Sequence, residues 1–226
     1  MSSKASLAGI AIRGTLLTET VIVLDFETTG LSPRQGARPT EVAAVVLEGN
    51  SIVDRFSSLM NPGVPIPRQI QSLTGITNKM VSSAPSVATV MGEFANFIRG
   101  VPLIAHNASF DRQFLDWEFN RLGLRREQSM LCSMLLARRV YPSSPNHKLG
   151  TLVDYVNLKM TGRYHRAEAD AEITAKLWVE MKNEIKRCCQ IDSVPIDLME
   201  HIQKVPCRSM KSHVHRYFRV RSELCR

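Results

Sequence analysis

Long apolar runs are missing from this sequence, and none approaches the roughly 20 residues that a membrane-spanning helix needs. Internal repeats and low-complexity tracts are also absent. These absences exclude a membrane bundle and a repeat protein, and we expect no membrane partner. Hydrophobic residues make up 44% of the 226 residues and charged residues 22%, which is typical of a globular protein with one large domain and a short appendage.

Cysteine is scarce, with five residues and no Cys-x-x-Cys pair. An odd number at this length does not indicate a disulfide scaffold, so we expect reduced thiols and a cytoplasmic location. Residues 1–18 form a predicted N-terminal extension that lacks the long apolar core and cleavage site of a secretion signal. A transit peptide remains an open alternative for this segment.

Acidic residues are outnumbered: 29 Lys and Arg stand against 21 Asp and Glu, which gives a net charge of +8. A basic surplus favours a polyanionic partner. Part of it lies at the C-terminus, where residues 207–226 hold six Lys or Arg and one acid. We therefore divide the chain into the extension, a domain over 19–187 and a basic helical tail over 188–226. The tail could contact nucleic acid, dock on a protein partner or remain a solvated surface.

The order of expected elements indicates an α/β fold with a mixed sheet. Val21–Asp25 is a continuous apolar run, typical of a strand buried on both faces. Two further strands are expected over 40–47 and 51–60, with a turn between them. The remaining predicted elements are a strand over 102–106 and helices over 86–99, 109–122, 131–140, 149–156, 167–187, 196–203 and 209–218.

Asp25 and Glu27 form the first group of residues that could carry chemistry. They lie two apart at the end of a strand, so both side chains point to the same face. Two carboxylates repel each other and are costly to desolvate, although a polar strand end would be an ordinary alternative. The glycine at position 30 lets the chain turn beside them. Paired carboxylates at a tight turn suit a hard divalent cation such as Mg²⁺.

Two later segments combine histidine with aspartate. His106 ends a predicted strand, and Asp111 lies in the first turn of the next helix, where an acid also suits the helix dipole. We expect His106 to be a hydrogen-bonded core residue. His165 and Asp170 are five apart, about 140° around an ideal helix, so they converge only if His165 lies on the loop before that helix.

The three segments occur in the order LDFETTG, HNASFD and HRAEAD. Together they resemble the DEDDh 3′–5′ exonuclease family, also called DnaQ-like. This family includes the proofreading epsilon subunit of bacterial DNA polymerase III and ribonuclease T. The segments TEVAAVV and LTGIT also resemble a strand and a substrate loop of that family, whereas the loop RQGARPTE is a position of variable length.

The resemblance implies a ribonuclease H-like domain with a central mixed five-stranded sheet flanked by helices, followed by the short helical tail. It also implies that Asp25, Glu27, Asp111 and Asp170 bind two Mg²⁺ or Mn²⁺ ions, with His165 as the general base. A histidine titrates close to neutral pH and can accept a proton from water there. The implied substrate-binding residues are Phe26, Thr28, Thr29, Leu73, Thr74 and Ile76.

The implied activity is removal of nucleoside 5′-monophosphates from the 3′ end of single-stranded nucleic acid, with DNA favoured over RNA. An RNA-trimming exoribonuclease and a polymerase-associated proofreading subunit that docks through its tail are the alternatives. A binding protein without activity is disfavoured, because the four acids and the histidine are all present.

Overall fold

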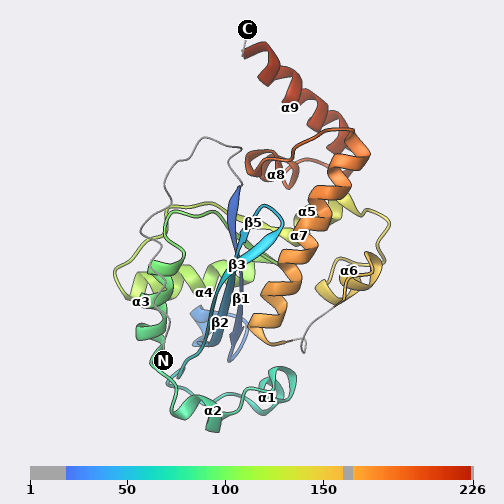
Figure 1. Cartoon of the computed structure of the whole chain (residues 1–226). Helices are drawn as coiled ribbons and strands as arrows, with labels where there is room; N and C mark the ends of the chain where they lie inside the picture. The colour runs from blue at the N-terminus through green and yellow to red at the C-terminus, as the bar shows by residue number, and fades with distance from the viewer. Residues whose placement is uncertain (1–18, 160–164, 225–226) are drawn as a thin grey trace.

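The computed structural model describes residues 19–159 and 165–224, and the predicted N-terminal extension lies outside the described residues. A five-stranded mixed sheet forms its centre, with the order β3-β2-β1-β4-β5 (Figure 1). The two pairings among β1, β2 and β3 are antiparallel, and those of β4 with β1 and β5 are parallel. The strands are β1 (Thr20–Thr28), β2 (Pro39–Glu48), β3 (Ser51–Leu59), β4 (Leu103–Ala105) and β5 (Met130–Cys132).

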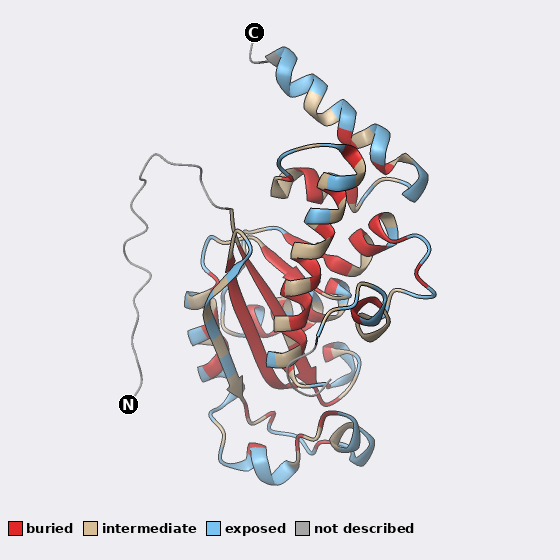
Figure 2. Ribbon diagram, turned by 45° about the vertical axis from the view of Figure 1, so that its right-hand side comes forward, coloured by how far each residue is buried: buried red, intermediate tan, exposed pale blue. Residues whose placement is uncertain are grey.

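Helices cover both faces of the sheet (Figures 1 and 2). One face packs on α3 (Val87–Phe97) and α4 (Ala108–Arg121), and the other on α7 (Ala167–Cys189). The other helices are α1 (Arg68–Thr74), α2 (Asn78–Ser82), α5 (Ser133–Val140), α6 (Leu149–Tyr155), α8 (Ile196–Ile202) and α9 (Met210–Leu224). The prediction of a mixed five-stranded sheet flanked by helices, with a helical C-terminal segment, is confirmed.

β1 is the central strand because apolar residues line both of its faces. Val21 and Val23 belong to the cluster beneath α7, and Ile22 and Leu24 to the cluster beneath α3 and α4. All four side chains are at most 2% exposed. The strand also continues to Thr28, three residues beyond the predicted end, because Phe26 to Thr28 still pair with β2. Because the strand continues, the side chains from Asp25 to Glu27 alternate between the two faces of the sheet.

Two segments differ from the sequence prediction. Residues 131–140 were expected to be one helix, but Met130–Cys132 form β5 and the helix begins at Ser133. Three apolar residues are too few to reveal a period, and only pairing with β4 makes them a strand. The segment after the proline-rich loop folds into α1 and α2, which were not predicted. These helices have seven and five residues, too few to show a helical period in the sequence.

The hydrophobic core continues through the predicted tail. Leu198 and Ile202 of α8 and Val214 of α9 are fully buried in the cluster that α7 and α5 form. These apolar residues of the predicted tail therefore pack against the domain itself. None of the helices in the described part of the chain combines the length and the hydropathy that crossing a bilayer requires.

Candidate active site

The acidic residues of all three sequence segments line one cavity at the carboxyl end of β1, with a volume of about 320 Å³. Asp25 and Glu27 come from β1, Asp111 from the first turn of α4, and Asp170 from the first turn of α7. Segments more than 140 residues apart in the sequence thus meet at one edge of the sheet. His165, just before α7, lines the same cavity.

Asp25 and Glu27 share the face of β1 that α7 covers, as the two-residue period of a strand requires. Asp25 is half-buried, and Glu27 is buried. Directly across the strand pair from Glu27 stands a further buried acid, Glu41 of β2. Three carboxylates therefore lie on neighbouring positions of two strands.

Asp111 reaches the site from α4, which begins immediately after the short strand β4. Asn107 makes this sharp change of direction with a left-handed backbone, φ 63°. Asparagine tolerates that conformation better than most residues. Asp111 is 1% exposed, and its Oδ1 accepts a hydrogen bond of 3.1 Å from the backbone N–H of Phe26. The carboxylate is thereby fixed against the strand that carries Asp25 and Glu27.

His165 and Asp170 converge because His165 lies outside the helix. Its backbone is left-handed, φ 61°, and its N–H donates to Oδ2 of Asp170 over 2.9 Å. The other oxygen of Asp170, Oδ1, is buried and has no hydrogen-bond partner among the described residues. One nitrogen or oxygen atom from each of Glu27, His165 and Asp170 lies within 4.8 Å of the other two.

An ion pair that the sequence analysis missed holds this segment to the sheet. Arg166 donates from Nε and Nη2 to the two carboxylate oxygens of Glu41, at 3.1 and 2.7 Å. Glu41 Oε2 also accepts from the backbone N–H of Ala167, the first residue of α7. The only signal for Glu41 in the sequence was a single acid at the start of an apolar strand, in TEVAAVV.

Burial and mutual repulsion raise the pKa values of the acids. Burial, followed by the charges of Asp170, Glu41 and Asp111, raises the pKa of Glu27 to about 8. Burial raises the pKa of Asp111 to about 7, although the N–H of Phe26 opposes the rise. For Asp25, burial and the neighbouring carboxylates raise the pKa well above its usual value. The pKa of Asp170 is also raised, mainly by burial.

These properties fit divalent cations. The carboxylates of the cavity repel one another, and burial further disfavours their charged form. A bound cation would offset both the repulsion between the carboxylates and the free-energy cost of burying their charge. Asp170 lines this space, and its Oδ1, which has no partner among the described residues, is available as a ligand atom. Carboxylate oxygens are the ligands that Mg²⁺ and Mn²⁺ prefer.

The substrate residues implied by the resemblance divide into two groups. Phe26, Thr28, Leu73 and Thr74 line the cavity. Ile76 does not, because its fully buried side chain packs with Ile66 and Val81. Thr29 also lies outside the lining, where its Oγ1 accepts from the N–H of Arg38.

Phe110 and His106 also border the cavity. Phe110 lines the cavity, and its ring centroid lies 5.2 Å from that of Phe114. One side of its ring therefore packs against a neighbouring aromatic residue while the residue also borders the cavity. His106 is hydrogen-bonded as expected, with Nδ1 2.9 Å from Ser133 Oγ and Nε2 3.0 Å from the carbonyl oxygen of His147. Burial lowers the pKa of His106 to about 4, so its ring is a fixed, neutral wall near pH 7.

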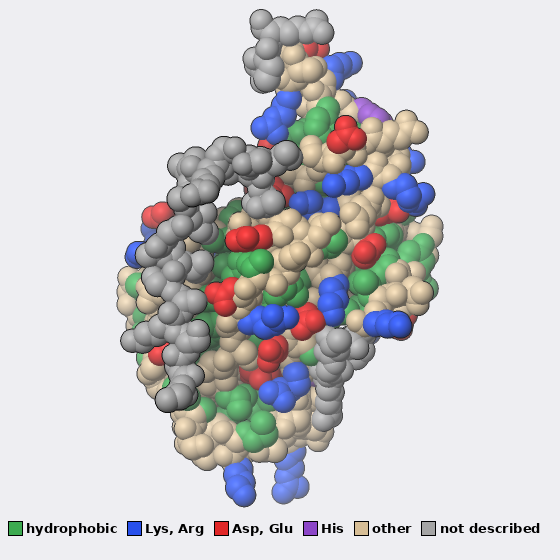
Figure 3. All heavy atoms as spheres, viewed as in Figure 1, with side chains coloured by type: hydrophobic (Ala, Val, Ile, Leu, Met, Phe, Trp, Pro, Cys, Tyr) green, Lys and Arg blue, Asp and Glu red, His purple; other side chains and the backbone are tan. Residues whose placement is uncertain are grey.

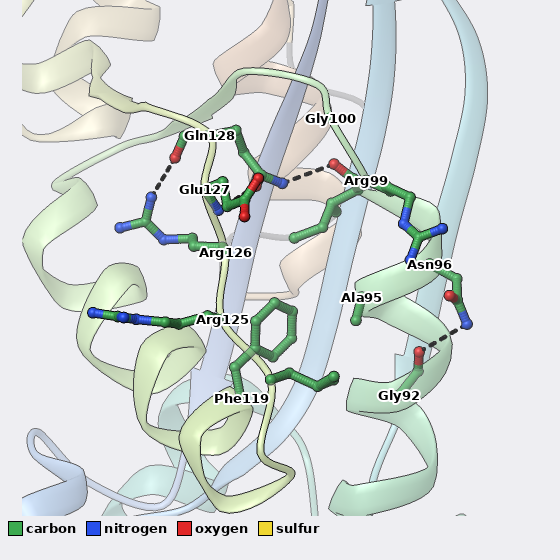
Figure 4. A pocket seen from close by; sticks show the side chains of 12 residues that line it. Gly92, Ala95, Asn96, Arg99, Gly100, Phe119, Arg125, Arg126, Glu127 and Gln128 are labelled. Carbon is green, nitrogen blue, oxygen red and sulfur yellow. Dashed lines mark hydrogen bonds between the residues drawn. The ribbon is translucent and has the colours of Figure 1, made fainter.

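A larger cavity of about 660 Å³ lies away from these acids, between α3 and the segment before β5 (Figure 4). Arg99, Arg125 and Arg126 border it. Arg126 is engaged by Asp116 at 2.7 Å and by the carbonyl oxygen of Gln128. None of the residues that line it comes from the three sequence segments. Size alone therefore does not mark the reactive site of this molecule.

A ribonuclease H-like sheet with four acids at the edge where its central strand ends is the arrangement of a nuclease domain, a hydrolase of phosphodiester bonds. A family model described as an exonuclease matches residues 22–178, which include all of these acids and the histidine. The chain belongs to this exonuclease family, and the resemblance found in its sequence is confirmed.

Relatives with similar sequences fall into two size classes. The chain is 36% identical over 190 residues to a PolC-type DNA polymerase III of Caldanaerobacter subterraneus, covering 82% of this chain but 13% of that protein. It is 35% identical to the 3′-5′ exonuclease DinG of Bacillus subtilis, covering 74% of this chain and 18% of that protein. It therefore spans less than a fifth of these two relatives. With the DNA polymerase III subunit epsilon of Aquifex aeolicus the identity is 32%, covering 80% of this chain and 90% of that protein.

Solved structures share the fold. Exonuclease X in complex with 5′ overhanging duplex DNA is 29% identical, with a TM-score of 0.59 and coverage of 72% of this chain and 91% of that one. The nuclease domain of 3′hExo, a DEDDh family member bound to rAMP, has a TM-score of 0.64 at 20% identity and covers 78% and 96% of the two chains. The second likeness concerns the fold alone.

Proposed function

We propose that this chain is a metal-dependent 3′–5′ exonuclease that removes nucleoside 5′-monophosphates from single-stranded DNA. One observation carries the proposal: four acids from three distant segments converge on a single cavity, and one buried oxygen of Asp170 has no partner among the described residues. Asp25, Glu27, Asp111 and Asp170 would hold two Mg²⁺ or Mn²⁺ ions. Bound there, such ions neutralise charge on the phosphodiester and lower the pKa of the attacking water.

His165 is the general base in this proposal. Its side chain is exposed at the mouth of the cavity, where water can reach it, and its backbone is fixed to Asp170. A base must lie within hydrogen-bond reach of the proton that it accepts, directly or through one water. The other histidine at the cavity, His106, is excluded from this role because both of its ring nitrogens are engaged within the protein.

The terminal nucleotide would lie against the apolar part of the cavity wall. Leu73 is 49% exposed at its rim, and Phe110 presents part of its ring from α4. Apolar and aromatic surfaces of this kind bind an unpaired base without reading its identity. Thr28 holds the turn after β1, since its Oγ1 donates to the carbonyl oxygen of Gly30 over 2.6 Å.

DNA is the favoured substrate because the relatives above 30% identity include DNA polymerase III proteins, and Exonuclease X was solved with DNA. The DNA polymerase III relatives also raise an alternative, a proofreading subunit that docks on a polymerase through residues 188–226. We keep the boundary between the exonuclease domain, residues 19–187, and the tail, residues 188–226, as part of this proposal. The packing of α8 and α9 argues against testing it by removing the whole segment, because that would expose Leu198, Ile202 and Val214.

The test is a time course on 5′-labelled single-stranded DNA and RNA of one sequence, with Mg²⁺, Mn²⁺ or EDTA. We expect a ladder that shortens from the 3′ end only with metal, and faster on DNA. Asp25→Ala is the control for contaminating nuclease and should produce no ladder.

Three outcomes would change the proposal. Faster shortening of the RNA would favour the exoribonuclease. Cleavage by Asp25→Ala at the same rate would remove the acids from the mechanism. No cleavage of either strand by the unmodified protein would reject the exonuclease activity itself.

A further inference from the structure

Helix α9 presents two different faces. Met210 and Val214 are buried against α7 and α8, and Tyr217 and Phe218 are half-buried on the same side. Tyr217 strengthens this attachment, because its hydroxyl donates to Oδ2 of Asp197 in α8 over 2.6 Å. One face therefore anchors the helix, which projects from the end of the molecule as mostly exposed ribbon (Figures 1 and 2).

The exposed side of this segment is mostly basic, and its one acid is Glu223, four residues after Arg219. We call four exposed residues the basic face: Arg208, in the short 3₁₀ turn before α9, and Lys211, Arg216 and Arg219 of α9. None of them forms an ion pair with an acid in the part of the chain that the structure describes. Arg221 on the anchored side differs, since it pairs with Asp197 at 3.3 Å and lies over the Tyr217 ring. Lys and Arg side chains stand out along this end of the molecule in Figure 3.

The basic face lacks the apolar stripe of a helix that docks on a protein groove. A hollow of about 340 Å³ runs along it, and its lining residues are all polar or charged: Ser212, His215, Arg216 and Arg219. Hydroxyl, imidazole and guanidinium groups are phosphate-binding groups. Among the side chains of α9 that the structure describes, Val220 is the one large apolar side chain that is exposed, at 46%.

We propose that the basic face binds the phosphate backbone of the substrate strand, upstream of the 3′ end held in the active site. This proposal rests on the proposed function, because it concerns how the same strand is retained. Contacts to phosphates are independent of sequence and supply much of the affinity for a single strand.

The position of α9 gives the proposal a length dependence. The active site lies at the N-terminal end of α7, whereas α9 packs near its C-terminal end. The 23 residues of α7 at 1.5 Å per residue separate the two by about 35 Å. A strand with a stacked spacing of about 3.4 Å needs roughly ten nucleotides to reach from one to the other. Shorter strands occupy the active site without contacting α9.

The test variant is Arg216→Gln/Arg219→Gln, compared on a 5-mer and a 30-mer of single-stranded DNA. We expect KM for the 30-mer to rise about tenfold, with kcat unchanged and the 5-mer unaffected. The affinity of the 30-mer, measured by fluorescence anisotropy in EDTA, should also become less dependent on salt. The slope of log K against log[salt] should fall in magnitude by about 1.4, which is 0.7 for each lost phosphate contact.

The matched control is Arg99→Gln/Arg125→Gln, which removes the same charge from the exposed rim of the larger cavity at the other side of the fold. It should leave KM for the 30-mer and the salt slope within twofold of the unmodified protein. Equal effects of the two variants would reduce the proposal to non-specific charge and overturn it. An unchanged 30-mer affinity in Arg216→Gln/Arg219→Gln would overturn it too, and would leave a protein as the partner of α9. Binding without cleavage by the unmodified protein would reject the proposed function and not this inference.

Discussion

Arg166 and Glu41 form a two-point ion pair between residues 125 positions apart, with one side chain partly in solvent and the other buried. Glu41 is 3% exposed and Arg166 is 40% exposed. The pair joins β2 to the start of α7, so it fixes the two residues on either side of it, His165 and Asp170, relative to the sheet. The geometry of the proposed base and of one proposed metal ligand thus depends on a contact that lies outside the cavity lining.

The two partners should respond differently to substitution. Arg166→Ala leaves a buried carboxylate with only the Ala167 N–H, so we expect the free energy of unfolding to fall by about 3 kcal/mol. Glu41→Gln leaves an arginine that water can reach and removes a charge facing Glu27, so we expect a loss of about 1 kcal/mol. Urea denaturation in EDTA measures both. Equal losses would contradict this asymmetry.

Steady-state kinetics of the Arg166→Ala and Glu41→Gln variants distinguish a role in positioning His165 and Asp170 from a role in stability alone. Both variants should lower kcat more than they raise KM, at a temperature where each remains folded. Arg166→Lys retains the charge but not the two-point geometry, so it should restore stability in part and kcat less. A rise in KM alone would place the pair outside the control of His165 and Asp170.

His165→Ala should lower kcat by about 100- to 10,000-fold, the usual contribution of a general base. A ring nitrogen of His165 also lies within 4.8 Å of carboxylate oxygens of Glu27 and Asp170. The same variant therefore tests whether His165 binds metal. We expect Mn²⁺ affinity, measured by isothermal titration calorimetry, to change less than threefold. A large loss of Mn²⁺ affinity would make His165 a metal ligand instead of the base.

The metal-free protein should lose stability as the pH rises from 6.5 to 8.5. Glu27 and Asp111 have folded-state pKa values of about 8 and about 7, above their ordinary values, so the folded protein holds more protons than the unfolded chain in this range. Stability therefore falls with rising pH, by on the order of 2 kcal/mol for Glu27. His106 does not contribute, because its folded-state pKa of about 4 leaves it neutral here.

Thermal unfolding in EDTA across this range measures the effect. Glu27→Gln should flatten the profile and raise the melting temperature at pH 8.5. Added Mg²⁺ should stabilise the unmodified protein most at the alkaline end, because fewer protons must then be displaced. A metal-free melting temperature that does not change with pH would show that these carboxylates are already ionised at neutral pH.

Leu73 and Ile76 lie three residues apart and should have separable roles. Leu73 is 49% exposed at the cavity rim, so Leu73→Ala should raise KM for DNA severalfold and change stability by less than about 0.5 kcal/mol. Ile76 is fully buried in its small cluster, so Ile76→Ala should cost about 2 to 4 kcal/mol. Steady-state kinetics and urea denaturation on both variants decide this. If Ile76→Ala raised KM without lowering the free energy of unfolding, Ile76 would be a substrate-binding residue, as the resemblance implied.

Features that depend on local pattern could be predicted from the amino-acid sequence. The two-residue period of a strand put Asp25 and Glu27 on one face. The five-residue separation of His165 and Asp170 required a loop before the helix, which the structure has. The apolar run at Val21 identified the central strand, and the order of the acidic segments identified the family.

Contacts between residues far apart in the sequence depend on how the segments pack together. β5 is a strand because β4 lies beside it, and Ile76 is buried because Ile66 and Val81 cover it. Glu41 became part of the site through Arg166, 125 residues away. Periodicity reports which face a side chain occupies within its own segment, whereas the partner across that face is set by how the segments pack, and no local pattern encodes that choice.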